Sequence, residues 1–248
     1  MILRKFLIKS GSFFFRFRNF LFPALVVFLF LFIKPSYFLG SRTLDNIIVA
    51  LGITIALAGQ AIRFLVIGFA YIKRGGRNGQ VFADDLVKEG FYNHVRNPMY
   101  VANFLILSGL GMICGSPWVY FLIIPFFGFV YLAIVVTEED YLRGRFGSEY
   151  EEYCKRVNRF LPNLSGIRES LGRFSYDWRK AIRKDFGTFL GVLIGCHTIL
   201  LWKRYYFYTF PSSKSDIAVS ESVFILIVIC YVWILYLKKT GRLKSPYQ

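Results

Sequence analysis

The sequence predicts an all-α fold: a polytopic transmembrane bundle of about six spanning helices, with short cytosolic amphipathic helices beside it. Hydrophobic residues make up 55% of the 248-residue chain, whereas soluble domains are usually about 45–50% apolar. These residues are gathered into blocks, and one block, residues 99–137, contains no Asp, Glu, Lys or Arg. A soluble core helix rarely needs so long an uncharged run, so the pattern indicates membrane spans.

The distribution of charged and metal-binding residues narrows the function classes. The net charge is +16, a value that also occurs in nucleic-acid-binding proteins. Here the basic residues flank apolar blocks instead of lining one folded face, as expected when Lys and Arg collect in cytoplasmic loops. We therefore expect contact with membrane lipids and no nucleic-acid partner. The four scattered cysteines and two histidines predict neither a disulfide framework nor a metal site.

The chain divides into three regions. Residues 1–45 comprise a basic N-terminal segment and a first span at residues 20–33, which we interpret as uncleaved because no small-residue cleavage site follows it. Residues 46–162 form a membrane core that begins with a second span at 47–72 and continues into a basic loop. Residues 163–248 are a C-terminal extension with an amphipathic segment and two more spans, 188–202 and 219–237.

The core continues with a helical hairpin whose arms are residues 98–114 and 118–137. Gly115, Ser116 and Pro117 form its tight turn. Six spans place both termini on one side of the membrane, and the basic residues are more frequent on that side. The positive-inside rule then predicts cytoplasmic termini, and we expect the protein to lie in a bacterial inner membrane.

The first motif is residues 90–100, a loop that becomes a helix at the cytoplasmic surface. Asn97 suits a helix N-cap and Pro98 suits the first helical turn. A helix start presents unpaired N–H groups and a positive dipole end, which can hold a carboxylate. Tyr92 and Tyr100 can stack on a ligand or hydrogen-bond to it. An ordinary helix start with interfacial tyrosines is the alternative.

The second motif is the pair Glu138 and Glu139, at the point where the uncharged run stops. Two adjacent carboxylates at a membrane boundary have three possible roles: solvated end charges, partners for Arg96, or ligands for a cationic group. The residues by themselves leave these roles open.

The third motif is residues 146–162. Ser148 and Glu151 have the spacing of a capping box, and the helix that they begin is expected to end at Pro162. An apolar face is predicted on this helix, made by Tyr150, Tyr153, Val157 and Leu161. The helix would lie against the membrane or cover a pocket.

Together the three motifs resemble the isoprenylcysteine carboxyl methyltransferase and phospholipid methyltransferase superfamily, in the form of a bacterial-type member. The chain matches its pattern at Gly90, Tyr92, Arg96, Asn97, Pro98, Tyr100, Glu138, Glu139, Leu142, Phe146, Gly147, Tyr150, Tyr153, Val157, Arg159 and Pro162. The resemblance extends back to Arg63 and covers about half of the chain. It specifies the superfamily and leaves the substrate open.

The resemblance implies a helical membrane bundle that binds S-adenosyl-L-methionine in a cytosol-facing pocket, while the acceptor enters from the lipid. The implied cofactor-binding residues are Asp85, Leu86, Val87, Tyr92, Asn97, Pro98, Met99, Tyr100 and Glu138. Eukaryotic members have His where this chain has Asn97, and Arg, which engages the substrate, where it has Ile134. A free prenylcysteine carboxylate would have lost its cationic partner, so we expect a lipid or another lipophilic small molecule as acceptor.

Methyl transfer from a sulfonium is an in-line displacement, so the protein mainly aligns the reactants and excludes water. We predict Glu139 and Arg96 as the orienting or deprotonating groups of the catalytic site. Arg63 lies inside the second span, where a charge is costly. We predict that it has a buried partner and binds substrate, with snorkelling to the interface as the alternative.

Two other hypotheses for the whole chain remain. One is a non-catalytic membrane scaffold of the same fold, and the other is a membrane enzyme resembling sterol reductases that uses a nicotinamide cofactor. Residues 173–184 are basic and aromatic and are interpreted as a surface helix on anionic lipid.

Overall fold

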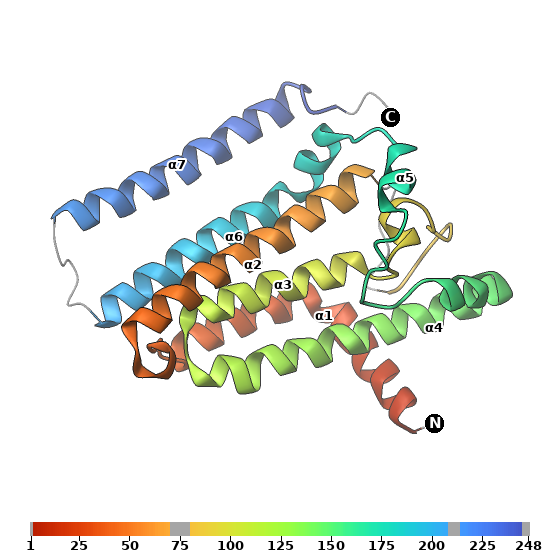
Figure 1. Ribbon diagram of the computed structural model, residues 1–248, viewed down its shortest axis with the longest axis horizontal. Helices are drawn as coiled ribbons and strands as arrows, with labels where there is room; N and C mark the ends of the chain where they lie inside the picture. The colour runs from red at the N-terminus through yellow and green to blue at the C-terminus, as the bar shows by residue number, and fades with distance from the viewer. Residues whose placement is uncertain (1, 70–79, 208–213, 245–248) are drawn as a thin grey trace.

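A computed structural model describes residues 2–69, 80–207 and 214–244, without the side chains of residues 19, 21–26, 28–30 and 214–217. The regular elements of these ranges are helices (Figure 1), which confirms the all-α class. The long helices are α1 (Ile2–Phe32), α2 (Arg42–Phe69), α3 (Pro98–Cys114), α4 (Ile124–Arg156), α6 (Trp178–Phe207) and α7 (Lys214–Lys239). The short ones are η1 (Phe38–Gly40), η2 (Gly90–Asn93), η3 (Val119–Ile123) and α5 (Ile167–Gly172).

Within the described residues, four helical stretches are long and apolar enough to cross a membrane: Arg42–Phe69, Val119–Arg156, Trp178–Phe207 and Ala218–Lys239. The helix Pro98–Cys114 is apolar but shorter. The first predicted span, residues 20–33, falls in the second half of α1, where most side chains lie outside the described residues. The chain is therefore a helical membrane protein, and the predicted number of about six spans is not confirmed.

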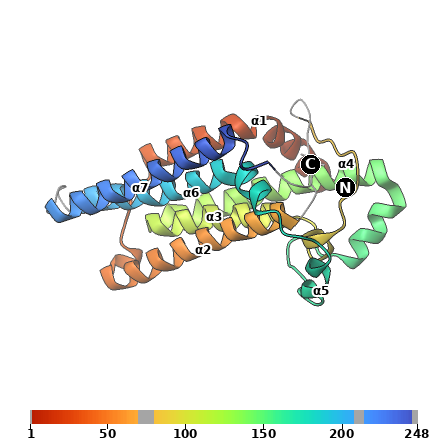
Figure 2. The same ribbon diagram turned by 90° about the horizontal axis from the view of Figure 1, so that it is seen from above.

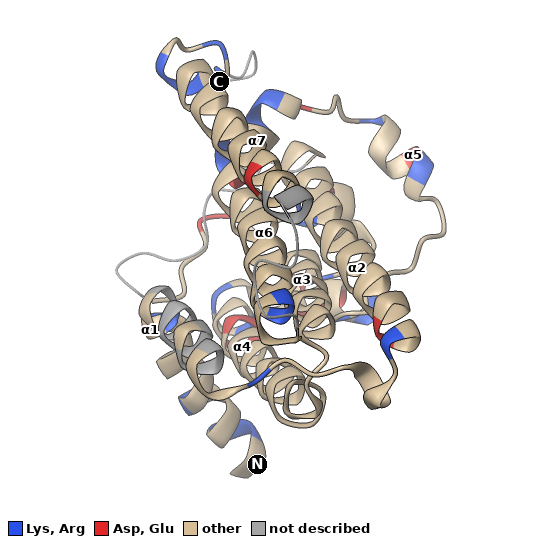
Figure 3. Ribbon diagram, turned by 90° about the vertical axis from the view of Figure 1, so that its left-hand side faces the viewer, with Lys and Arg blue, Asp and Glu red and all other residues tan. Residues whose placement is uncertain are grey.

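The helices run alternately in opposite directions, so the start of α1, the end of α4, the start of α6 and the end of α7 lie at one end of the bundle (Figure 1). The short helix α5 lies at this end too. Seen from above, α2, α3 and α6 run side by side (Figure 2). Lys and Arg lie mainly at helix ends and in the connecting segments (Figure 3), which keeps most charges away from the middle of the bundle.

Small residues let α2 and α3 approach closely. Gly52, Ala56 and Gly59 are buried on α2 and face Ala102 and Gly109 of α3. A Cβ atom added at Gly109 would lie 2.4 Å from the Gly52 carbonyl oxygen. Backbones of membrane helices meet in this way where small residues line both surfaces.

Small residues also let α1 pack closely against α4. A Cβ atom added at Gly11 would lie 2.0 Å from the Ala133 carbonyl oxygen. The Thr137 hydroxyl donates a hydrogen bond to the Ile8 carbonyl oxygen at 3.1 Å. One turn farther along α1, Phe15 is buried against α4. The first half of α1 is therefore packed closely against α4.

The opposite end of the bundle is closed by a buried ion pair. The Lys203 ammonium donates to Asp45 Oδ1 at 2.7 Å and to the Ile113 carbonyl oxygen at 3.0 Å. These contacts join the end of α6, the start of α2 and the end of α3. Gly115 follows with a φ of 74°, and its carbonyl oxygen accepts a hydrogen bond from the Ser36 hydroxyl at 2.9 Å.

Two predicted boundaries are wrong. α4 does not stop where the charges begin but continues to Arg156, with a kink at Gly147, whose φ is 51° and ψ −126°. The helix therefore ends before Pro162, and Leu161 is 78% exposed instead of sharing a face with the buried Tyr150 and Tyr153. Glutamates are good helix formers, so a change in hydropathy marks a change of solvent and not the end of a helix.

The predicted surface helix at residues 173–184 is also wrong. α5 ends at Gly172, and α6 begins at Trp178 and continues into the span without a break. The reason is Asp177, whose carboxylate accepts a hydrogen bond from the Lys180 N–H at 2.8 Å. This is the geometry of a helix N-cap.

Candidate functional site

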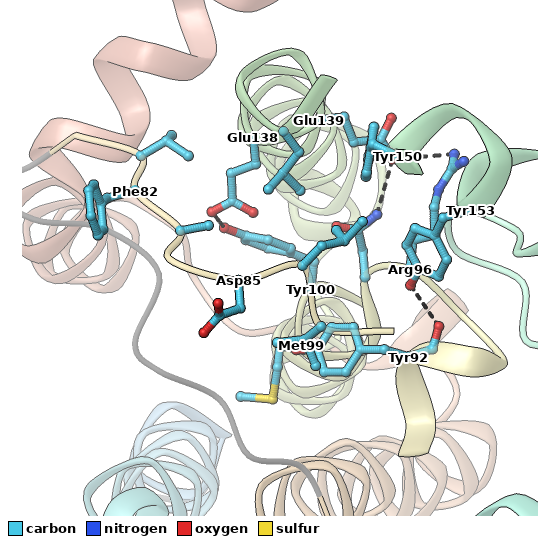
Figure 4. A pocket seen from close by; sticks show the side chains of 16 residues that line it. Phe82, Asp85, Tyr92, Arg96, Met99, Tyr100, Glu138, Glu139, Tyr150 and Tyr153 are labelled. Atoms are coloured by element: carbon cyan, nitrogen blue, oxygen red, sulfur yellow. Dashed lines mark hydrogen bonds and ion pairs between the residues drawn. The ribbon is translucent and has the colours of Figure 1, made fainter. Parts of the chain in front are cut away.

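A cavity of about 170 Å³ lies at the end of the bundle where α3 begins and α4 passes its middle (Figure 4). From the segment before η2, Asp85, Leu86 and Val87 line it, and Tyr92 does so from η2 itself. The lining also includes Asn97 just before α3, Met99 and Tyr100 of α3, and Glu138 of α4. Pro98, the remaining residue of the predicted cofactor set, is fully buried at the first position of α3 and does not line the cavity.

Glu138 lines this cavity together with two other carboxylates, Asp85 and Glu139. Its Oε1 atom accepts a hydrogen bond from the Tyr100 hydroxyl at 2.7 Å. Burial, and then the Glu138 charge, raise the pKa of the Tyr92 phenol well above its ordinary value. Tyr92 is therefore protonated at neutral pH, and the cavity presents a carboxylate acceptor beside phenolic donors.

Glu139, its neighbour, has different surroundings. The Arg159 guanidinium donates to both carboxylate oxygens, with its closest contact 2.7 Å between Nη2 and Oε2. Arg96 approaches to 3.3 Å from the other side, and the Asn97 amide donates to the same carboxylate at 3.3 Å. Glu139 is only 3% exposed. With both oxygens accepting hydrogen bonds from cations, Glu139 is better placed to orient its neighbours than to remove a proton.

Asn97 occupies the N-cap position of α3, but its side chain does not cap the helix. Its amide donates to Glu139 and to the Arg159 carbonyl oxygen, and its own backbone carbonyl accepts from the Tyr100 and Val101 N–H groups. The first turn of α3 therefore begins at the cavity without a side-chain cap over it. Uncapped helix starts of this kind favour anions.

The segment after α4 is bound along η2. The Arg96 N–H donates to the Asn158 carbonyl oxygen at 2.9 Å. His94 Nδ1 lies 2.6 Å from the Asn163 carbonyl oxygen, and the Asn163 N–H donates to the His94 carbonyl oxygen at 3.0 Å. These contacts fix the loop that carries Tyr92. They also account for His94 as a buried residue that links two backbones.

Six residues of the lining were not among the predicted site residues: Val81, Phe82, Ala83, Leu142, Tyr150 and Tyr153. The last three belong to the superfamily pattern, so the motif itself could have indicated them. Tyr153 also donates to the Tyr92 carbonyl oxygen at 2.6 Å. Residues 81–83 carry no local signal in the sequence, because their place in the wall is set by tertiary contacts.

Arg63 has the buried partner that its position predicts, and that partner is a carboxylate on α6. It forms an ion pair with Asp185, which also accepts a hydrogen bond from the Gln60 amide at 2.7 Å. Asn103 and Thr188 accept further hydrogen bonds from the Arg63 guanidinium. Arg63 is not part of the cavity lining, so its predicted contact with substrate stays a prediction.

Comparison with known proteins gives matches to the middle of the chain. Residues 47–149 match the family model of phospholipid methyltransferases. The nickel-cobalt-cadmium resistance protein NccN of Alcaligenes xylosoxydans xylosoxydans is 33% identical over 48% of this chain and 50% of its own length. The cobalt-zinc-cadmium resistance protein CzcN of Cupriavidus metallidurans is 37% identical over 34% of this chain and 38% of its own.

A third relative is the protein-S-isoprenylcysteine O-methyltransferase of Schizosaccharomyces pombe, 36% identical over 31% of this chain and 33% of its own length. The chain thus spans half or less of each of these relatives. No solved structure matches. The family model and the yeast enzyme confirm the resemblance predicted from the motifs: residues 47–149 are related to the isoprenylcysteine carboxyl methyltransferase and phospholipid methyltransferase superfamily.

Proposed function

We propose that this protein is an integral-membrane methyltransferase that uses S-adenosyl-L-methionine and methylates a lipid or another membrane-partitioned small molecule. The observation that carries the proposal is the composition of the cavity at the end of the apolar bundle. The cavity combines a carboxylate (Glu138), an uncapped helix start (α3) and tyrosine side chains. Each of these features suits a different part of the cofactor.

The donors and acceptors of the lining fit the chemistry of S-adenosyl-L-methionine. The start of α3 would hold the carboxylate of the methionine part. Glu138 would accept hydrogen bonds from ribose hydroxyls or from the amine. Leu86, Val87 and Leu142 provide apolar surface for the adenine ring, and aromatic faces attract a sulfonium cation. The cofactor would supply an activated methyl group that a nucleophile can take in one displacement.

The remaining work of the site is alignment and the exclusion of water. Arg96 and Glu139 join the loop before α3 to α4, and Arg159 joins the segment after α4 to the same carboxylate. In this proposal they are positioning residues that keep the cavity walls together. An acceptor that is already a free amine, thiolate or carboxylate needs little help from a general base.

The first test is calorimetry with S-adenosylhomocysteine on protein purified in a neutral detergent. Glu138→Gln is expected to weaken binding by about tenfold, as for the loss of a charge-assisted hydrogen bond. Glu149→Gln is the matched control, because Glu149 lies on the same helix but pairs at the surface with Lys88. Absence of binding by the unaltered protein, or equal affinity of the Glu138 variant, would overturn the proposal.

The second test separates the other hypotheses. Labelled methyl groups should pass from the cofactor into a product in a total membrane extract, which a non-catalytic scaffold would not achieve. A reductase resembling the sterol enzymes would instead bind a nicotinamide cofactor and leave S-adenosylhomocysteine unbound. Competition between the two cofactors on the same sample therefore decides between these classes.

A further inference from the structure

α1 stands directly behind one wall of the cavity. Phe15 is 3% exposed and packs with Val130 and Ile134 of α4, and Val81 and Tyr100 pack against this cluster. Val81 and Tyr100 both line the cavity. The N-terminal helix, which lies outside the matched residues 47–149, therefore helps to shape the site.

One turn beyond Phe15, α1 carries a cation that faces the same region. The Arg18 guanidinium lies over the Phe15 ring, 4.2 Å from its centroid. A helical side chain points back toward the helix N-terminus, so the group reaches toward Tyr100 and Glu138. Phe15 belongs to the cluster against which Tyr100 packs, so the Arg18 guanidinium lies on the side of α1 that borders the cavity wall.

Along the axis of the bundle, Arg18 lies beyond the level at which the uncharged run of α4 ends. Ile8 lies level with Thr137, the last residue of the uncharged run, because their hydrogen bond joins α1 to α4. Ten residues at 1.5 Å each place the Arg18 backbone roughly 15 Å farther along the helix. A cation at membrane depth is costly unless it has a partner or a function.

The described part of the chain gives Arg18 no ion pair within 4.0 Å, whereas three other arginines at this end of the bundle have one. Arg4 pairs with Asp140, and Arg96 and Arg159 pair with Glu139. A guanidinium has five donors in a planar fork, and this geometry matches the oxygens of a carboxylate or a phosphate. The group therefore has the chemistry to bind an anion at the edge of the cavity.

We propose that Arg18 binds an anionic group, a phosphate or a carboxylate, on the headgroup of the methyl acceptor. The acceptor is then an anionic lipid or amphiphile that enters the cavity along α1. This inference rests on the proposed methyltransferase function and names its substrate class. The apolar cluster of Phe15, Val130 and Ile134 would contact the chain next to the headgroup, and Arg18 would select for its charge.

The experiment measures binding of two single-chain anions, dodecyl phosphate and dodecanoate, to full-length protein in a neutral dodecyl maltoside micelle. Arg18→Gln is expected to weaken binding of at least one of them by about tenfold. Arg18→Lys keeps the positive charge but loses the planar arrangement of donors, so its affinity for the anion should lie between those of the unaltered protein and Arg18→Gln. If Arg18→Gln weakens binding of dodecyl phosphate more than binding of dodecanoate, the group bound by Arg18 is a phosphate; the reverse result indicates a carboxylate.

Arg16→Gln is the matched control, since Arg16 is on the same helix and lies over Phe17 at 5.5 Å, away from the cluster around Phe15. It should leave anion binding unchanged. Affinity for S-adenosylhomocysteine and the thermal midpoint are measured on every variant, so that loss of folding is recognised.

Three results would overturn the proposal about Arg18: no binding of either anion by the unaltered protein, equal binding by Arg18→Gln and Arg16→Gln, or loss of S-adenosylhomocysteine affinity alone. The last would mean that Arg18 balances Glu138 within the cofactor pocket. Failure of the methyltransferase proposal has a different signature, because the unaltered protein would then not bind S-adenosylhomocysteine whatever it does with the anions.

Discussion

Two adjacent carboxylates on α4 differ in what surrounds them. Both line the cavity, but Glu138 accepts a hydrogen bond from the Tyr100 phenol, whereas Glu139 accepts hydrogen bonds from Arg159 and Asn97. The sequence left three roles open for this pair, and one of them, pairing with Arg96, is confirmed for Glu139. Neighbouring positions on a helix point about 100° apart, which is why one acid can hold the structure while the other meets a ligand.

The prediction at this scale concerns Glu139→Gln. The substitution leaves Arg96 and Arg159 facing an uncharged amide, and breaking a buried ionic group usually costs about 3–5 kcal/mol. We expect a lower thermal midpoint in detergent. Glu149→Gln, which loses an exposed pair with Lys88, should cost at most about 1 kcal/mol. Equal midpoints for the two variants would contradict the structural role assigned to Glu139.

Among the elements, α3 is the one whose bounds the sequence predicts best. Pro98 favours the start of a helix, and Gly115 adopts the positive φ at which α3 ends. Each end of α3 is therefore determined by the conformational preference of a single residue. α4 shows the converse, because nothing local stops a helix at Glu138 and Glu139. The start of α6 at Trp178 is marked by the side-chain cap of Asp177, which is hard to recognise within a basic and aromatic segment.

The prediction for elements concerns the close approach of α2 and α3. In Gly109→Ala the new methyl group would overlap the Gly52 carbonyl, and overpacking of this kind costs about 1–3 kcal/mol. Gly191→Ala on α6 is the control, since no atom lies within 4 Å of the added Cβ. Thermal unfolding in detergent should separate the two variants, with only Gly109→Ala less stable than the unaltered protein. If both variants unfold together, the small-residue contact is not what holds the two helices.

For the whole molecule, the buried pair of Arg63 and Asp185 joins the C-terminal extension to the core. The two residues are 122 positions apart, so sequence reasoning could predict that Arg63 has a partner but not which one. The pair lies in α2 and α6, beyond the lining of the cavity. The extension is therefore joined to the superfamily-related part of the chain through a buried ion pair.

The prediction for the whole molecule is a comparison of single and double variants. Asp185→Asn leaves Arg63 buried beside an amide and should lower stability by about 3–5 kcal/mol, whereas Arg63→Leu with Asp185→Leu should recover much of this loss. Thermal midpoints measure both, with the exposed pair variant Glu169→Gln as control. If Asp185→Asn unfolds like the control, the pair does not hold the extension. A loss of acceptor turnover in a stable double variant would instead support the predicted contact of Arg63 with substrate.

The kink at Gly147 divides α4 into two parts that have different surroundings. Before the kink the helix is a candidate membrane span that carries Glu138, and after it the same helix contributes Tyr150 and Tyr153 to the cavity. The candidate membrane span and the segment that lines the cavity with Tyr150 and Tyr153 therefore belong to one continuous helix. A helix tilts when the thickness of its bilayer changes, so we expect the width of the cavity to change with the lipid that surrounds the protein.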